Sequence, residues 1–318
     1  MGILRAMSDP RSRRPRIVVV GVLVLDVVLA PHRALESATD VPGRIALRQG
    51  GSAATTARWL ARRGARVTLV SAIGRDAPGR ALVEAVRRDG VAVRVRRVAG
   101  ARTGRIGVLV APDGERSFVA DRGAADLLSP DHLRPGWFAG AALLHLPAYS
   151  LLGEPLGRTG RRAIELARAA GALVTVDAAS VGPLLAEGRP AALAILRQAS
   201  PDLLFATADE AARLAGSRGP ERLLELAPII VLKRGPQGAS IVLREGGARR
   251  TFDVATRPIQ ALDTTGAGDA FDAGFIVAWL AAQGDGVGVR AALRRAALAG
   301  HRAAARRLVA PHEELRLR

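Results

Sequence analysis

The segment LDTTGAGDAF, residues 262–271, sets a polar, glycine-rich turn directly before a long apolar stretch. Glycines let a backbone approach an anion closely, and the N–H groups at the start of a helix point toward such an anion. Asp269 stands at this positive helix end. There it either caps the helix or accepts a proton while the neighbouring amides stabilise negative charge. The residues of this segment leave both interpretations open.

On either side of this segment, short apolar stretches alternate with longer helical patterns. Strands are predicted at residues 17–20, 67–72, 142–146, 173–177, 203–206, 229–232 and 240–243. Helices are predicted at residues 52–63, 79–89, 158–170, 191–198, 210–215, 267–283 and 288–308. Such alternation is typical of βαβ units, so the sequence predicts an α/β fold with a mainly parallel sheet and helices on both faces.

Two extended stretches, residues 32–49 and about 102–121, interrupt this alternation. The second holds two apolar runs around Pro112-Asp113-Gly114, which is the pattern of a β-hairpin. Together they predict a small antiparallel β-lid over one end of the sheet. Residues 1–16 are polar and basic and contain two prolines, so we expect a flexible tail there. Residues 17–318 are predicted to form the folded domain.

The chain carries 47 Lys and Arg against 29 Asp and Glu, a formal net charge of +18, and all but one of its basic residues are arginine. Such a charge permits binding of nucleic acid or of another anion. Aromatic residues make up only 3% of the chain, so surfaces that could stack on bases are scarce. We therefore expect an anionic substrate and no nucleic-acid partner. The absence of cysteine excludes disulfides, thiolate metal sites and cysteine nucleophiles.

Residues 17–30 form an apolar run behind basic residues, the pattern of a signal peptide. Asp26 interrupts this run, however, and its β-branched start favours a buried strand. It is also shorter than the roughly 20 residues that a membrane-spanning helix needs. We therefore expect a cytoplasmic protein without a membrane partner.

Two further turns precede predicted helices. The segment GGSAATTA, residues 50–57, begins with two glycines that would let a polar ligand touch the backbone, although glycine and serine also begin ordinary helices. Asp76 follows a predicted strand, where ligands of open α/β sheets gather. For Asp76 the sequence favours a structural role in the turn.

Together these segments resemble the ribokinase-like (PfkB) family of carbohydrate kinases. The resemblance runs from residue 17 to about residue 307, and its two signatures are residues 50–79, GGSAATTARWLARRGARVTLVSAIGRDAPG, and residues 263–275, DTTGAGDAFDAGF. The second signature is highly specific in this order and near the C-terminus. The resemblance implies a three-layer α/β/α sandwich with a mainly parallel central sheet and a β-lid over the sugar site.

The activity implied by this resemblance is transfer of the γ-phosphoryl group of ATP to a hydroxyl of a sugar or sugar derivative. Asp269 would accept the proton of the attacking hydroxyl. The amides of Gly266, Ala267 and Gly268 would form the anion hole for the transferring group. Mg²⁺ would bridge the nucleotide phosphates, with Glu210 holding it through water.

The resemblance also assigns the remaining binding residues. The sugar would be bound by Asp26, Gly50, Gly51 and Thr55. The nucleotide would lie against Lys233, Gly235, Gly238 and Thr265. Asp263 and Thr265 match positions that help bind a monovalent cation such as K⁺ in many members. Two of these residues have simpler interpretations: Asp26 as a loop cap, and Lys233, the only lysine, as a surface residue.

Three positions depart from the family pattern, which often has asparagine where this chain has Thr55, Thr207 and Ala125. A threonine hydroxyl lacks the paired donor and acceptor of an amide. The chain contains no asparagine at all, so the departures indicate a general bias, an altered substrate or a weakened activity. The alternatives to a sugar kinase are a nucleoside kinase of the same family and a pseudokinase that binds without turnover. The β-lid also indicates a homodimer.

Overall fold

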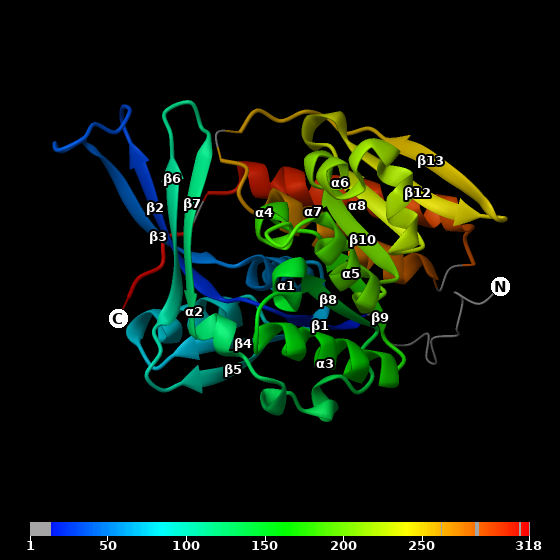
Figure 1. Ribbon diagram of the computed structural model, residues 1–318, viewed down its shortest axis with the longest axis horizontal. Coiled ribbons are helices and arrows are strands. Elements are labelled where there is room, and N and C mark those ends of the chain that lie inside the picture. The colour runs from blue at the N-terminus through cyan, green and yellow to red at the C-terminus, as the bar shows by residue number, and fades with distance from the viewer. Residues whose placement is uncertain (1–13, 262, 284–285, 312, 318) are drawn as a thin grey trace.

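The computed structural model describes residues 14–261, 263–283, 286–311 and 313–317. Its central sheet has nine strands in the order β13-β12-β11-β10-β9-β8-β1-β4-β5 (Figure 1). The strands from β5 to β11 run parallel to their neighbours, whereas β12 and β13 are antiparallel. Their bounds are β1 (Arg16–Val20), β4 (Arg66–Gly74), β5 (Ala92–Val98), β8 (Leu143–Pro147), β9 (Leu173–Asp177), β10 (Leu203–Thr207), β11 (Ile229–Lys233), β12 (Ala239–Glu245) and β13 (Ala248–Val254). This mainly parallel sheet confirms the predicted α/β fold class.

Helices cover both faces of the central sheet because successive side chains of a strand point to opposite sides. In β1, Val19 belongs to one hydrophobic core, while Val18 and Val20 belong to the other. The first core is completed by α1 (Ser52–Arg62), α2 (Ala77–Arg88), α7 (Ala267–Gln283) and α8 (Val289–Val309). The second is completed by α3 (Leu156–Ala169), α4 (Val181–Leu184), α5 (Arg189–Ala199) and α6 (Ala208–Ala215). The result is the three-layer sandwich that the sequence predicts.

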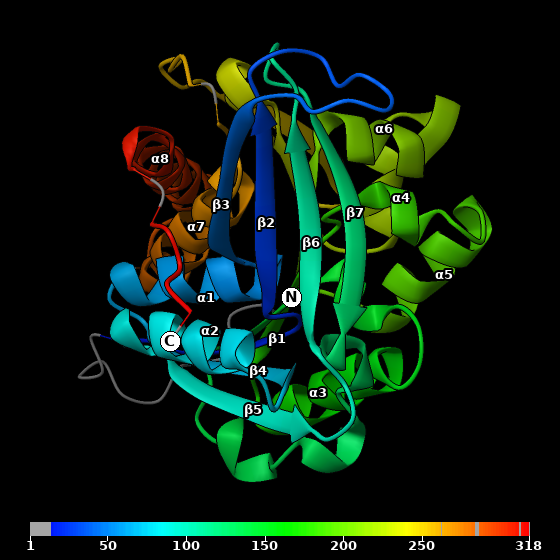
Figure 2. The ribbon, with the colours of Figure 1, turned by 90° about the vertical axis from the view of Figure 1, so that its left-hand side faces the viewer.

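A small sheet of four strands, in the order β3-β2-β6-β7, stands beside the central sheet (Figure 2). It consists of β2 (Val24–Pro31), β3 (Gly43–Gly50), β6 (Thr103–Val110) and β7 (Arg116–Gly123). The hairpin predicted around Pro112-Asp113-Gly114 joins β6 to β7. The sequence predicts an antiparallel lid, but β2 pairs with β6 in parallel, so the small sheet is mixed.

The apolar run at residues 17–30 divides between the two sheets, so Asp26 lies within a strand and is not a loop cap. The chain leaves β1 at Gly21, where a Cβ atom would lie 2.6 Å from Ser150 Oγ and 2.7 Å from Ala53 Cβ. It then enters β2 at Val24, earlier than the predicted start of the lid at residue 32, and Asp26 lies within β2 opposite Arg48. Hydrophobicity alone shows no break here.

The predicted N-terminal tail falls mostly on residues 1–13, which lie outside the described residues, and Arg16 already belongs to β1. Strands β5 and β13, in which arginines interrupt the apolar positions, were not predicted. Among the described residues, no helix is both long and apolar enough to cross a bilayer.

Candidate active site

A cleft of about 420 Å³ opens where the small sheet faces the start of α7. Its floor includes the last residues of three adjacent parallel strands: Asp177 of β9, Thr207 of β10 and Lys233 of β11. The carboxyl ends of parallel strands are where open α/β sheets bind their ligands. The small sheet contributes Asp26 and Arg48 to the same cleft.

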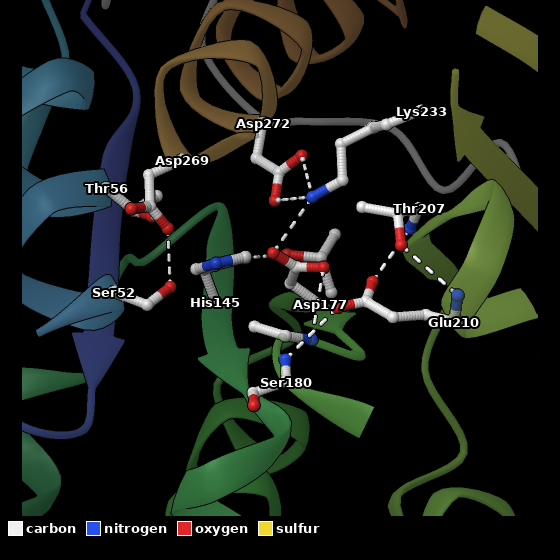
Figure 3. A network of polar contacts seen from close by, with 12 residues as sticks. Ser52, Thr56, His145, Asp177, Ser180, Thr207, Glu210, Lys233, Asp269 and Asp272 are labelled. Carbon is white, nitrogen blue, oxygen red and sulfur yellow. Dashed lines mark hydrogen bonds and ion pairs between the residues drawn. The ribbon is translucent and has the colours of Figure 1, made fainter. Parts of the chain in front are cut away.

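Asp269 lies in this cleft on the first turn of α7 and is held by the facing helix α1 (Figure 3). Ser52 donates a hydrogen bond to its Oδ1 at 2.5 Å, and Thr56 donates to the same oxygen at 3.3 Å. Burial raises the pKa of Asp269 to about 6, and the hydrogen bond from Ser52 opposes that rise. The carboxyl group is therefore mostly ionised at pH 7, and its pKa lies close to the value that suits a general base.

The glycine turn before α7 lies next to this carboxylate. Gly266 has a φ of +76°, which glycine adopts without strain, and a Cβ on it would lie 3.9 Å from Asp269 Oδ2. Gly266 and Gly268 line the cleft, whereas Ala267 does not and donates its N–H to the carbonyl of Thr264 at 3.1 Å. Of the three residues predicted to form an anion hole, only Gly266 and Gly268 therefore face the cleft at the start of α7.

Asp26 faces the same cleft from the small sheet. A Cβ on Gly50 would lie 1.8 Å from Asp26 Oδ1, so the carboxyl group occupies space that only a glycine at residue 50 leaves open. Burial raises the pKa of Asp26 to about 7, Arg48 opposes that rise, and Asp269 adds to it. Gly51 and Thr55 line the cleft, and Gly50 supports Asp26 without lining it.

Lys233 joins three structural elements beneath the cleft (Figure 3). Its ammonium group lies 3.0 Å from Asp177 Oδ2 and 3.2 Å from Asp272 Oδ1 of α7, with only 10% of its side chain exposed. Burial alone would lower the pKa of this lysine, but Asp177 and Asp272 together hold it above its usual range. The group stays charged, and a Cβ on Gly268 would lie 3.4 Å from its Nζ.

The carboxyl groups of Asp177 and Asp272 around Lys233 have pKa values shifted in opposite directions. Burial raises the pKa of Asp272 well above its usual range, and the nearby Asp177 raises it further. Burial also disfavours the ionised form of Asp177, but Lys233 holds the pKa of Asp177 below its usual range. Burial lowers the pKa of the nearby His145 to about 4, so that imidazole is neutral at pH 7. Lys233 therefore favours the ionised form of Asp177, whereas burial and the neighbouring Asp177 disfavour the ionised form of Asp272.

Thr207 and Glu210 begin α6 with reciprocal hydrogen bonds. Thr207 Oγ1 accepts from the Glu210 amide at 3.2 Å, and Glu210 Oε2 accepts from the Thr207 amide at 2.8 Å. Glu210 Oε1 accepts from the amide of Ser180 at 3.1 Å. Threonine at residue 207 therefore preserves the helix cap, and Glu210 presents an oriented carboxylate to the cleft. Carboxylate oxygen suits a water-bridged Mg²⁺, so this residue fits that ion.

The carboxylate of Asp263 forms ion pairs with two arginines of the small sheet. Arg48 lies 2.8 Å from its Oδ2, Arg116 lies 2.8 Å from its Oδ1, and the amide of Thr265 donates to Oδ1 at 2.9 Å. A monovalent cation at Asp263 would have to displace a guanidinium group and sit beside others. These residues do not fit the K⁺ expected from the sequence.

The other predicted residues lie at varying distances from the cleft. Gly235 lines a shallow neighbouring pocket with Thr207 and Lys233. Gly238 serves the turn, because a Cβ on it would lie 2.3 Å from the Val254 carbonyl oxygen. Asp76 caps α2 and binds Thr103, the structural role favoured from the sequence. Among the described residues, no group of three His, Asp or Glu is arranged to hold a metal ion.

Several residues in or next to the cleft were not predicted from the sequence. Ser52 and Thr56 stand four residues apart, so they share one face of a helix, and that spacing is a usable signal. Asp177 and Asp272 come together only through the sheet and α7. Arg48, Arg116 and Arg307 carry no local signal in a chain with so many arginines.

The cleft thus brings a buried carboxylate and a glycine-rich turn together beneath the small sheet. The chain matches the model of the pfkB family of carbohydrate kinases over residues 14–311. Fructokinase-1 of Zea mays is 32% identical over 271 residues, which cover 81% of this chain and 81% of the relative. The protein belongs to the pfkB carbohydrate kinase family and is a sugar kinase.

Solved structures agree with this fold. An adenosine kinase from Sinorhizobium meliloti superposes with a TM-score of 0.78 at 21% identity, covering 94% of this chain and 96% of that one. A putative ribokinase II from E. coli in complex with ATP and Mg²⁺ superposes with a TM-score of 0.73 at 22% identity, covering 90% and 92%. At these identities the likeness concerns the fold alone.

Proposed function

We propose that the protein transfers the γ-phosphoryl group of ATP to a hydroxyl of a sugar of the fructose or ribose type. The observation that carries the proposal is that Asp269 lines one cleft together with the glycine turn at Gly266 and the carboxyl group of Asp26. The fructokinase of Zea mays among the relatives supports fructose as the first acceptor to test.

The reaction follows from these positions. Asp26 accepts hydrogen bonds from sugar hydroxyls and directs one hydroxyl toward Asp269. Asp269 takes the proton of that sugar hydroxyl. At the same time the hydroxyl oxygen forms a bond to the γ-phosphorus of ATP, and the bond between the γ-phosphorus and the oxygen that leaves with ADP breaks. The amides of Gly266 and Gly268, with the dipole of α7, stabilise the charge on the transferring group, and the Lys233 charge lies just below.

The nucleotide side of the proposal rests on Lys233, Gly235 and Thr207, which share the shallow pocket that adjoins the cleft. Glu210 would hold the bound Mg²⁺ through water, and the ion would neutralise charge on the phosphates of ATP. The E. coli ribokinase II structure with ATP and Mg²⁺ has the same fold and supports this choice of nucleotide and metal. The cytoplasmic location of the protein described here stays a prediction.

A panel of acceptors tests the proposal. With Mg²⁺ and ATP, we expect ADP release to depend on fructose or ribose and to exceed that with adenosine. Preference for adenosine would favour a nucleoside kinase. Tight binding of sugar and ATP without any phosphorylated product would favour a pseudokinase, and the assignment of Asp269 as a base would fail with it.

We further propose that the protein forms a homodimer through the outer face of the small sheet. Leu29, Ile45 and Val119 are exposed there by 36%, 69% and 78%. Strand alternation puts them on the face opposite Asp26, Val28 and Phe118, which line the cleft. A second copy would cover this apolar face and leave the cleft open.

A further inference from the structure

Three arginines from three elements converge on the turn between β13 and α7. Arg48 of β3 and Arg116 of β7 hold the two oxygens of Asp263 at 2.8 Å each. Arg307 comes from the last turn of α8 and lines the cleft. A Cβ on Gly266 would lie 3.4 Å from Arg307 Nε, which puts this side chain beside the anion-binding turn.

The position of Arg307 is fixed by the packing of α8 on α7. A Cβ on Gly274 would lie 2.6 Å from the Ala299 carbonyl oxygen, and a Cβ on Gly300 would lie 2.8 Å from the Phe271 ring. These two glycines let the helices approach closely. The close packing brings the end of α8 to the start of α7, where Asp269 and Gly266 lie.

The surroundings of Arg307 contain charges of both signs. Arg48 and Arg116 contribute positive charge, and the carboxyl groups of Asp263 and Asp269 contribute negative charge. Burial lowers the pKa of Arg307, the charges of Arg48 and Arg116 add to that effect, and Asp263 and Asp269 oppose it. A guanidinium group keeps its charge under such conditions. The charge of Arg307 therefore lies in the cleft beside the turn at Gly266.

We propose that these arginines supply the cation of the site from the chain itself. Arg307 provides a fixed positive charge beside the anion hole and acts on the transferring group, while Arg48 and Arg116 are positioning residues that hold the Asp263 turn. Phosphoryl transfer then needs no monovalent cation. This inference rests on the proposed kinase activity, and it replaces the K⁺ that the sequence resemblance implies with residues that the structure shows.

The first test varies the monovalent cation at constant ionic strength. We expect kcat of the wild-type protein with ATP, Mg²⁺ and its acceptor sugar to change less than about twofold between potassium, sodium and choline chloride, because the structure leaves Asp263 no free oxygen for the ion. Saturable activation by potassium of roughly tenfold or more over choline would overturn the inference and leave the proposed function intact.

The second test removes the Arg307 charge. Arg307→Ala should lower kcat roughly 100-fold or more with a smaller change in the sugar KM, since a cation at the transferring group acts mainly in the transition state. Free guanidinium ion at millimolar concentration should restore part of the rate. The matched control is Arg306→Ala, an exposed neighbour on α8, which should keep a near-normal kcat. An Arg307→Ala variant with normal kcat, or one that guanidinium does not rescue, would contradict the inference.

A binding readout separates this inference from the proposed function. The thermal unfolding midpoint of the wild-type protein should be the same in potassium and choline chloride at equal ionic strength. A potassium-specific rise in this midpoint would overturn the inference even in a protein without kinase activity. Absence of turnover with every acceptor, together with equal midpoints, would contradict the proposed kinase reaction alone.

Discussion

Asp269 combines a raised pKa with two fixed hydrogen bonds, and that combination sets an expected pH dependence. Burial raises its pKa to about 6, and a base must be ionised to take a proton. At saturating sugar, kcat should therefore be constant above that pKa and fall about tenfold per pH unit below it. The measurement is kcat across pH with ADP release as the signal. A profile that stays flat well below that pKa would contradict the role of Asp269.

Asp26 should affect sugar binding separately from the chemical step. Gly50→Ala would place a Cβ 1.8 Å from Asp26 Oδ1 and push this carboxyl group from its position. The sugar KM should rise roughly 10- to 100-fold, because a hydrogen bond to a charged group contributes about 1.5–3 kcal/mol. The KM for ATP should stay the same.

Gly136→Ala is the control for this substitution, because a Cβ there meets nothing within 4 Å. A Gly50→Ala protein with an unchanged sugar KM would remove Asp26 from the sugar site.

Among the elements, β11, β9 and α7 are tied together by Lys233. Replacing Lys233 with methionine would leave Asp177 buried without its partner charge. Loss of one member of a buried ion pair typically costs about 3–5 kcal/mol, so the free energy of unfolding in urea should fall by that amount. Arg234→Met, at the half-exposed next residue, is the control. A Lys233→Met protein of unchanged stability would show that the cluster contributes nothing to the fold.

Local patterns predict most elements of the fold well. The bounds of α7 and β9 agree with the sequence because each is an apolar run ended by a turn or a charged residue. The break between β1 and β2 could not be seen, because both strands are apolar and only the crowding around Gly21 separates them. Strand β5 was not predicted, because arginines interrupt its apolar residues.

Some residues of the site could be predicted from the sequence and others could not, because only some of them are neighbours along the chain. Asp269 and its glycines are adjacent in sequence, so one motif contains them. Asp177, Lys233 and Asp272 lie far apart in the chain and meet only after the sheet forms. The surroundings of Asp263, where K⁺ was expected, could not be seen from the sequence, because Arg48 and Arg116 reach this carboxylate from strands more than a hundred residues away in the chain.

At the scale of the whole molecule, the outer face of the small sheet predicts the state of assembly. Light scattering should give the mass of a homodimer at micromolar concentration. Ile45→Glu should yield monomers with an intact cleft, because it puts a charge into the centre of an apolar interface. Glu245→Lys, which changes charge far from this face in β12, serves as the control. A monomeric wild-type protein would contradict the dimer and leave the kinase proposal untouched.

The central claim is that one carboxylate in the cleft between the two sheets deprotonates a sugar hydroxyl during phosphoryl transfer. The most direct measurement is the rate at which Asp269→Asn forms sugar phosphate from ATP and the preferred acceptor, followed by phosphorus NMR. We expect this rate to fall by roughly 10²–10⁴-fold with an unchanged unfolding midpoint, while Asp131→Asn, an exposed control, keeps the wild-type rate. An Asp269→Asn protein that forms sugar phosphate at nearly the wild-type rate would contradict the account.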